Sequence, residues 1–158
     1  MSVLRNRIGR LKTVTINDPE KTNCYAYALG TTGWFNPGSI AKVDVDFSDV
    51  YSIGMGAMAD AVDQGYTVRI VSGPDAKVYD NEWKIALRSG MAPVSGADFY
   101  DYHFMVQTST GQWAEKHGPG GDSILWEEGE TPDTIPWTLN GKEYYDSEII
   151  YFAIGGLQ

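Results

Sequence analysis

Residues 23–29 of this chain spell NCYAYAL, and the expected fold can be worked out from this short stretch. Asn23 is a favoured helix N-cap residue because its side chain can accept a hydrogen bond from a free N–H of the first turn. Gly30 follows the stretch and can end a helix in a left-handed conformation. We therefore expect a short helix over residues 24–29, with Cys24 in its first turn.

A second, longer helix is predicted between residues 48 and 65. Ser48 is the expected N-cap, followed by Asp49 in the first turn, where the helix dipole favours negative charge. The apolar residues that recur at i, i+3, i+4 and i+7 are Met55, Met58, Ala59 and Val62. This spacing predicts that they face the core. Gly54 and Gly56 weaken the helix unless they allow another element to pack closely.

The rest of the chain predominantly predicts strands. Apolar alternation indicates strands at 11–16, 66–71, 82–88, 102–108, 112–116 and 148–154. A long turn-rich stretch over residues 118–141 contains Trp126 and Trp137, and loops of this length are often functional. Helices early and strands late predict one α+β domain over residues 1–158, with an antiparallel sheet packed on the helices.

The composition excludes several classes of protein. The chain has 158 residues, 42% of them hydrophobic, which suits one buried core. Its net charge of -9 opposes nucleic acid as the main ligand. No stretch reaches the roughly 18 to 20 apolar residues of a membrane span, and the start lacks the apolar segment of a signal peptide. We therefore expect cytoplasmic synthesis without a cleaved signal or a membrane partner. Export by another route, or a place in a phage particle, is the alternative.

Four basic residues open the chain without an acidic residue among them. They are Arg5, Arg7, Arg10 and Lys12. Such an arm could dock on an acidic protein partner, or it could be a solvated and frayed end, which is the commoner state of a terminus.

Cys24 is the only cysteine, which excludes an internal disulfide and a Cys-rich zinc site. Near a helix N-terminus, free N–H groups and the dipole favour the thiolate, which is the nucleophilic form. The same N–H groups could stabilise an oxyanion. A cysteine at such a place is still more often structural, so other residues must decide its role.

The two histidines, His103 and His117, lie on either side of a Thr-Ser-Thr-Gly turn. If the hairpin loop centres on Ser109, His103 falls opposite Glu115 on the same face of the sheet. A two-residue turn ending at Gly111 would separate the two side chains instead. In the first register a base and an acidic orienting group stand side by side, as nucleophilic catalysis requires.

These residues resemble a known group of proteins. NCYAYAL at residues 23–29, DYHF at 101–104 and GQW at 111–113 are similar to bacterial and phage papain-like proteins, within the wider group of NlpC-type cell-wall peptidases and CHAP amidases. The resemblance implies a papain-like α+β fold, with a nucleophile helix and a second helix packed on an antiparallel sheet. Residues 44–90 contribute nothing to it.

The resemblance also implies roles for individual residues. Cys24 would attack, His103 would act as the base, and Glu115 would orient the imidazole. His117 is the alternative for the third position. Papain has a glutamine before its cysteine as an oxyanion donor, and residues 18–23 contain none, so either Asn23 or backbone N–H groups would have to serve.

Aromatic residues cluster in sequence around this proposed site. Those expected to bind substrate are Tyr25, Trp34, Tyr102 and Trp113. They could equally be ordinary core and surface aromatics, and the sequence leaves both interpretations open.

The function expected from these residues is cysteine-dependent hydrolysis of an amide bond through a thioester, without a cofactor or metal. The resemblance implies a peptide or peptidoglycan stem peptide as substrate. Transglutamination, deamidation and acyl transfer need the same machinery. The alternative is an inactive papain-like fold that serves as a structural or binding component, for example of a phage particle.

A metal site is a further alternative. Asp101, His103, Glu115 and His117 alternate on the two predicted strands of the hairpin, and imidazole and carboxylate ligands suit divalent ions. This hypothesis leaves Cys24 without a role.

Overall fold

The computed structural model describes residues 22–30, 33–94, 97–117, 123–139 and 141–156. The strand expected at 11–16 and the basic arm at residues 5–12 lie outside these ranges. Within them, no helix has the length and apolar character needed to cross a bilayer.

The described residues form two helices and six strands. These are α2 (Cys24–Ala28), α3 (Val50–Asp63), β1 (Thr67–Val71), β2 (Glu82–Val94), β3 (Ala97–Gln107), β4 (Trp113–Lys116), β5 (Ser123–Leu125) and β6 (Ile150–Gly155). All strands belong to one antiparallel sheet in the order β1-β6-β2-β3-β4-β5. The expected α+β class is therefore confirmed, and β5 is a strand that the sequence pattern did not predict.

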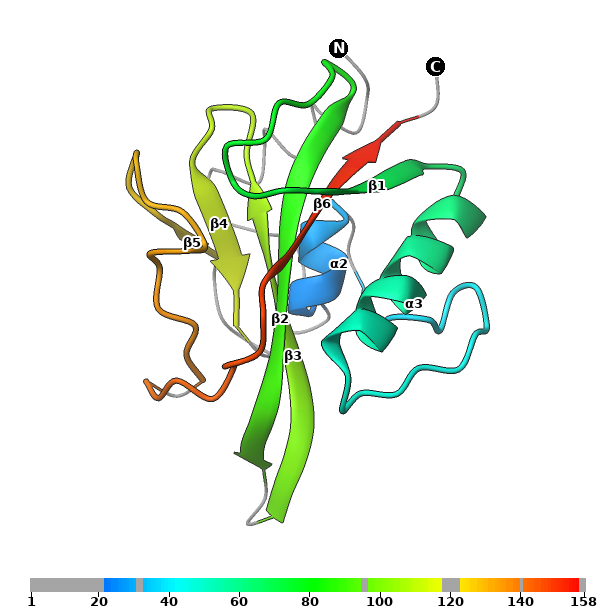
Figure 1. Ribbon diagram of the computed structural model, residues 1–158, viewed down its shortest axis with the longest axis vertical. Coiled ribbons are helices and arrows are strands. Elements are labelled where there is room, and N and C mark those ends of the chain that lie inside the picture. The colour runs from blue at the N-terminus through cyan, green and yellow to red at the C-terminus, as the bar shows by residue number, and fades with distance from the viewer. Residues whose placement is uncertain (1–21, 31–32, 95–96, 118–122, 140, 157–158) are drawn as a thin grey trace.

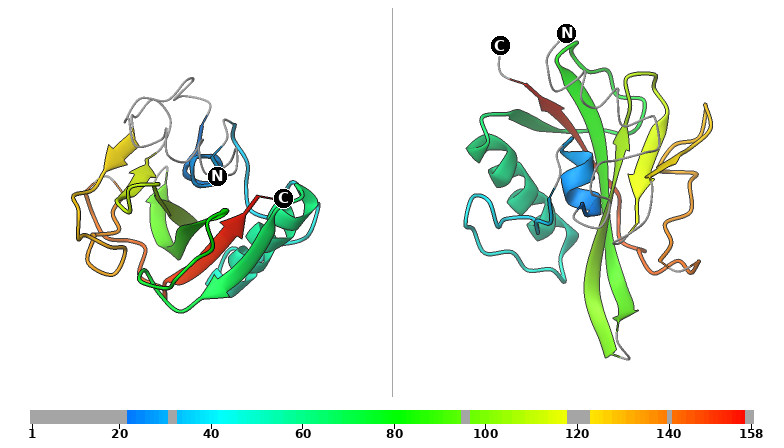
Figure 2. Two further views of the ribbon diagram at one scale, coloured as in Figure 1. Left: turned by 90° about the horizontal axis from the view of Figure 1, so that it is seen from above. Right: turned by 180° about the vertical axis from the view of Figure 1, so that it is seen from behind.

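The sheet is covered differently on its two faces (Figures 1 and 2). Both helices lie on one face, α2 against β3 and β4, and α3 against β1, β2 and β6. The main core cluster fills the space between them, from Tyr25 on α2 to Phe104 on β3 and Phe152 on β6. The irregular segment after β5 covers the other face, where Trp137 and Tyr145 pack on the sheet. A side chain of β3 therefore packs in one of two cores, depending on which face of the sheet it points to.

The buried face of α3 differs from the predicted one. Its N-cap is Asp49, whose side chain accepts from the Tyr51 N–H, and not Ser48. Met55 and Val62 are 63% and 62% exposed and do not face the core, whereas Met58 is partly buried and packs against the main core cluster. The apolar residues buried on this helix are Val50, Ile53, Ala57 and Ala61. The helix has two rows of apolar residues with helical spacing, and only one of them can face the sheet. The row with the smaller side chains is the one that fits the narrow space between the helix and the sheet.

Close packing around α3 explains its two glycines. A Cβ on Gly54 would lie 3.1 Å from the Phe152 ring, and one on Gly56 would lie 3.1 Å from the backbone nitrogen of Gly38. Both contacts are tighter than ordinary van der Waals distances, so the helix approaches β6 and the preceding loop only because these residues lack side chains. The expected role of the glycines in close packing is confirmed.

A buried carboxylate fixes α2 relative to α3. Asp60 on α3 is fully buried and accepts hydrogen bonds from the Tyr25 hydroxyl at 2.7 Å and from the N–H groups of Gly38 and Ala41 at 2.8 Å each. Because a buried carboxylate is costly unless it is hydrogen-bonded, these three donors make its position specific. Asp60 thereby holds the helix that carries Cys24.

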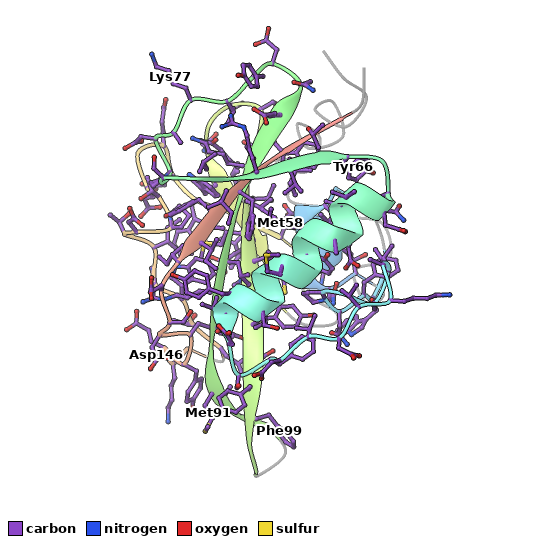
Figure 3. All side chains as sticks on the ribbon, turned by 45° about the vertical axis from the view of Figure 1, so that its right-hand side comes forward. Met58, Tyr66, Lys77, Met91, Phe99 and Asp146 are labelled. Atoms are coloured by element: carbon purple, nitrogen blue, oxygen red, sulfur yellow. The ribbon has the colours of Figure 1, made fainter. Side chains whose placement is uncertain are left out.

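The hairpin of β2 and β3 is longer than the sequence pattern predicted. It pairs continuously from Ile85↔Val106 to Val94↔Ala97 and extends beyond the body of the molecule, where Met91 and Phe99 are about half exposed (Figure 3). The predicted strands stopped at residue 88 and began at residue 102. Gly90 and Pro93 weaken the strand pattern locally, and cross-strand pairing overrides that preference.

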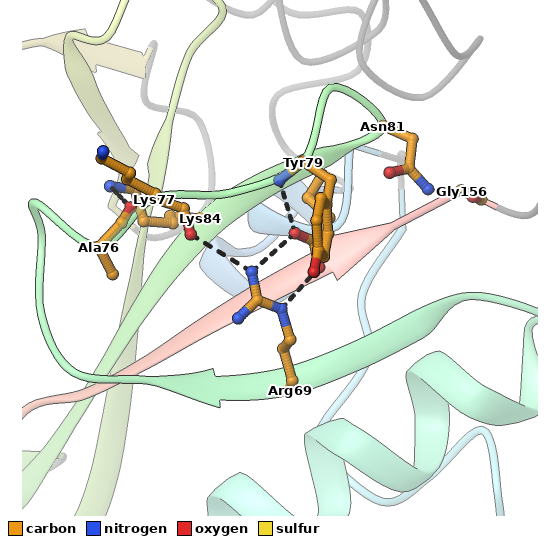
Figure 4. Close-up of polar contacts among 8 residues, drawn as sticks. Arg69, Ala76, Lys77, Tyr79, Asn81, Lys84 and Gly156 are labelled. Carbon is orange, nitrogen blue, oxygen red and sulfur yellow. Dashed lines mark hydrogen bonds and ion pairs between the residues drawn. The ribbon is translucent and has the colours of Figure 1, made fainter.

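At the other end of β2, polar contacts anchor the connection from β1 (Figure 4). Arg69 on β1 makes two hydrogen bonds to Glu82, at 2.9 and 3.0 Å, and Glu82 also accepts from the Tyr79 N–H. Lys84 donates to the carbonyls of Pro74 and Ala76. These contacts attach the 72–81 segment to the sheet.

Candidate active site

The register of β3 and β4 brings the predicted acid and base together in a way that the sequence did not specify. Met105 lies opposite Glu115, so continuing the ladder by two residues places His103 opposite His117. The loop centres on Thr110 and not on Ser109, and it ends at Gly111, whose φ is 90°. The expected direct opposition of His103 and Glu115 is therefore wrong by two residues. Because the shift is even, all three side chains still share one face.

Glu115 binds both histidines through one oxygen. Its Oε1 lies 2.8 Å from Nε2 of His103 and 2.6 Å from Nε2 of His117. The two imidazole rings are stacked, with their centroids 4.6 Å apart. His103 and Glu115 are buried, whereas the His117 side chain is 31% exposed. The site therefore has one inner histidine and one outer histidine on a shared carboxylate.

The charge of Glu115 determines the tautomer of His103. Burial by itself would raise the Glu115 pKa, but hydrogen bonds and charge from His103 and His117 outweigh it and lower the pKa to about 2. An ionised carboxylate can only accept, so Nε2 of His103 must carry the proton. In the neutral imidazole, Nδ1 is then the bare nitrogen that can take a proton from another group.

Three residues of the segment after β5 hold this pair in place, and the sequence pattern did not single out their roles. Trp126 donates from Nε1 to Oε2 of Glu115 at 2.5 Å. The Tyr145 ring stacks on His103 at 5.6 Å, and the Trp137 ring meets His103 edge-on at 5.9 Å. The only sequence signal was the unusual length of the Trp-bearing loop. In this structure the segment covers the His103 ring and holds Glu115.

Cys24 begins α2 and lies beside the open edge of β3. Ser89 on β2 exchanges hydrogen bonds with Ser147, so its backbone groups point away from β3. Tyr102 is the cross-strand partner of Ser89, so the backbone N–H and C=O groups of Tyr102 point away from β2, toward the β4 side of β3. The backbone groups of Phe104, two residues further on, point to the same side. On that edge β4 pairs with only the last three residues of β3. The Phe104 N–H there points at the Cys24 sulfur and lowers its pKa. The Cys24 sulfur is therefore next to the backbone of Phe104, the residue that follows His103 in β3.

Burial opposes the thiolate that the helix N-terminus was expected to favour. Burial of the sulfur dominates and raises the Cys24 pKa to about 12, and the negative charge of Asp101 adds to the effect. The N–H groups of Phe104, Tyr25 and Cys24 lower it by less. A five-residue helix has too few aligned peptide dipoles to offset the burial. Among the hydrogen bonds of the described residues, none joins the sulfur to His103.

Asn23 caps the helix as predicted. Its Oδ1 accepts from the Ala26 N–H at 3.0 Å, and its Nδ2 donates to the Phe35 carbonyl at 2.6 Å. The oxygen and the nitrogen of the side-chain amide therefore both have hydrogen-bond partners already. The first-turn N–H groups of Cys24 and Tyr25, which face the sulfur, are better placed than Asn23 to receive an oxyanion.

The four aromatic residues expected to bind substrate divide into two pairs. Tyr25 and Trp113 are buried core residues and cannot line an open groove, which corrects that expectation. Trp34 is 53% exposed. Tyr102 is partly buried near the sulfur, and its hydroxyl donates to Asn36 Oδ1 at 2.7 Å. Trp34 and Tyr102 remain candidates for contact with a substrate.

Of the four residues considered as metal ligands, three come together. Donor atoms of His103, Glu115 and His117 all lie within 4.8 Å of one another. Asp101 is bound elsewhere, because its Oδ2 accepts from the Tyr145 hydroxyl at 2.8 Å and its Oδ1 from the Tyr102 N–H.

Comparison of the chain with models of protein families, with curated proteins and with solved structures found no match.

Proposed function

We propose that this protein is a papain-like cysteine hydrolase that cleaves an amide bond through a thioester, with Cys24 as nucleophile and His103 as base. The observation that carries the proposal is the contact between His103 Nε2 and Glu115 Oε1, buried in the sheet one residue away from the strand N–H that faces the Cys24 sulfur. A peptide or a peptidoglycan stem peptide is the proposed class of substrate.

The base supports this proposal through its tautomer. Since Glu115 takes the Nε2 proton, Nδ1 of His103 is free to accept the proton of the thiol. The carboxylate would then stabilise the imidazolium that forms. Tyr145 and Trp137 restrict rotation of the ring, so the same nitrogen would later return the proton to the leaving amine.

The raised pKa of Cys24 indicates how the first step would proceed. A thiol with a pKa of about 12 is protonated at neutral pH, so its proton must leave as the sulfur attacks. The S–C bond forms while His103 takes the proton, and the carbonyl oxygen becomes an oxyanion that the Cys24 and Tyr25 N–H groups can receive. The amine leaves with a proton from His103, and water then hydrolyses the thioester.

A second candidate is a non-catalytic module with the same fold. The observation that favours it is the burial that keeps the Cys24 thiol protonated. Such a module would have no turnover, and Cys24 would act as a small, partly buried side chain.

Trapping of the thioester distinguishes the two candidates. The chain would be incubated with a library of peptide and stem-peptide amides, quenched in acid and examined by intact mass spectrometry. The proposal expects an acyl adduct on Cys24 that hydroxylamine removes, and amine release that Cys24→Ala abolishes. Asp63→Ala, an exposed change at the end of α3, is the control and should keep both signals. A library without any adduct or release would favour the non-catalytic module.

A further inference from the structure

The two histidines and Glu115 form a more compact set of donor atoms than an acid-base pair requires. An orienting carboxylate needs one histidine, yet here a second, His117, approaches the same oxygen at 2.6 Å. The register that pairs Met105 with Glu115 brings His117 to the same face as His103, where the two rings stack. The result is two imidazole nitrogens and one carboxylate oxygen within 4.8 Å.

This donor set has the composition of a zinc site. Two histidines and one glutamate, with a fourth position left open, is a known ligand set for Zn²⁺. Ligands about 2.0–2.1 Å from a tetrahedral ion are about 3.4 Å apart. The donor separations of 2.6 and 2.8 Å, and the 4.8 Å limit of the set, bracket that value. The two nitrogen–oxygen separations would have to lengthen by only about 0.6 and 0.8 Å to reach this value.

The surroundings also suit a metal ion. Trp126 holds Oε2 of Glu115 and leaves Oε1 for the histidines, as outer partners commonly orient a metal ligand. Among the described residues, the ion-pair contacts of Glu115 are those with His103 and His117. His117 is 31% exposed, so the outer of the two histidines is in contact with solvent.

We propose that His103, Glu115 and His117 bind one Zn²⁺ ion, and that this ion switches off the cysteine chemistry. The ion bonds to Nε2 of His103, so the ring proton moves to Nδ1. Nδ1 then donates and can no longer accept the thiol proton. The ion also takes the carboxylate that would stabilise the imidazolium. The inhibition, but not the binding, rests on the proposed function.

Calorimetric titration of the metal-free full chain with ZnCl₂ tests the binding. We expect one saturable site, unchanged in Cys24→Ser and weakened by about 10- to 100-fold or more in His117→Ala and in Glu115→Gln. Titration with Co²⁺ should give the visible bands of a four-coordinate N/O site without a thiolate charge-transfer band. Circular dichroism of each variant checks the fold, and His117→Ala is mild because this residue is partly exposed.

Several results would overturn the zinc site: no saturable binding, equal affinity in His117→Ala, or loss of binding in Cys24→Ser. The consequence is measured separately, as amide hydrolysis with and without Zn²⁺. We expect zinc to inhibit the wild type and to spare whatever activity His117→Ala retains. Zinc binding that activates hydrolysis would refute the cysteine mechanism and leave the metal site standing. Hydrolysis by a chain that binds no zinc would refute the metal site and leave the mechanism standing.

Discussion

Nε2 of His103 lies 2.8 Å from Oε1 of Glu115, although the two residues are not opposite each other in the β3–β4 ladder. Glu115 reaches diagonally past its partner Met105, and the His117 ring stacks on the His103 ring. His103 and His117 therefore share the Glu115 carboxylate. Protonation or substitution of any of the three residues should change the contacts of the other two.

The reactivity of Cys24 tests the effect of burial on the thiol. With a pKa of about 12, only about 10⁻⁴ of the thiol is ionised at pH 8, so iodoacetamide should react at least about 100-fold more slowly than with a model thiol of pKa about 8.5. Unfolding in urea should restore the ordinary rate. Rapid alkylation at pH 7 that His103→Ala abolishes would instead show a resting thiolate–imidazolium pair.

Substitutions at the three polar residues should differ in severity if the amide hydrolysis exists. His103→Ala removes the base and should lower kcat/KM by roughly 10²–10⁴-fold. Glu115→Ala should lower it less because the thiol and base remain, and His117→Ala should have the smallest effect. One substrate and one set of conditions are enough for the comparison. A silent Glu115→Ala beside a damaging His117→Ala would make His117 the third residue.

The lowered pKa of Glu115 predicts acid sensitivity. Its pKa falls from 4.5 to about 2 on folding, so ionised Glu115 contributes stability that is fully present above about pH 5. This contribution, about 3 kcal/mol at about 1.36 kcal/mol per unit, is lost as the pH drops through 4.5 toward 2. Urea unfolding at several pH values should show a shallower acid slope in Glu115→Gln than in the wild type. The exposed Glu128→Gln should keep the wild-type slope.

Substitution of Gly90 tests how closely the Tyr144–Tyr145 segment packs over the His103 ring. A Cβ there would overlap the backbone carbonyl of Tyr144, next to the Tyr145 that stacks on His103. Gly90→Ala should cost about 1–3 kcal/mol of unfolding free energy, as overpacking does, and should also reduce any hydrolysis by displacing Tyr145. Gly73→Ala is the matched control, since no atom lies within 4 Å of its added Cβ. Equal stability of the two variants would show that the Tyr144 segment moves without cost.

Much of this site could be predicted from local sequence. Asn23 has the side chain of an N-cap, so the short helix begins at Cys24 as expected. Strand alternation puts residues two apart on one face, so an even register brings Glu115 near His103. The class of the fold followed from the order of helical and strand patterns along the chain. These features depend on periods of two or 3.6 residues, which a sequence displays directly.

Other features required the tertiary structure. Two even registers satisfy the same alternation, and the turn that ends at Gly111 goes with the one that pairs Met105, and not His103, with Glu115. Which face of α3 is buried depended on the space between the helix and the sheet, and Met55 does not lie on that face. The Cys24 pKa depended on burial by residues far away in the sequence. Helix capping and alternation act over a few residues, whereas desolvation, packing volume and strand register depend on every element that meets at the site. For that reason the sequence by itself determined which residues could do chemistry, and only the folded structure decided their protonation and partners.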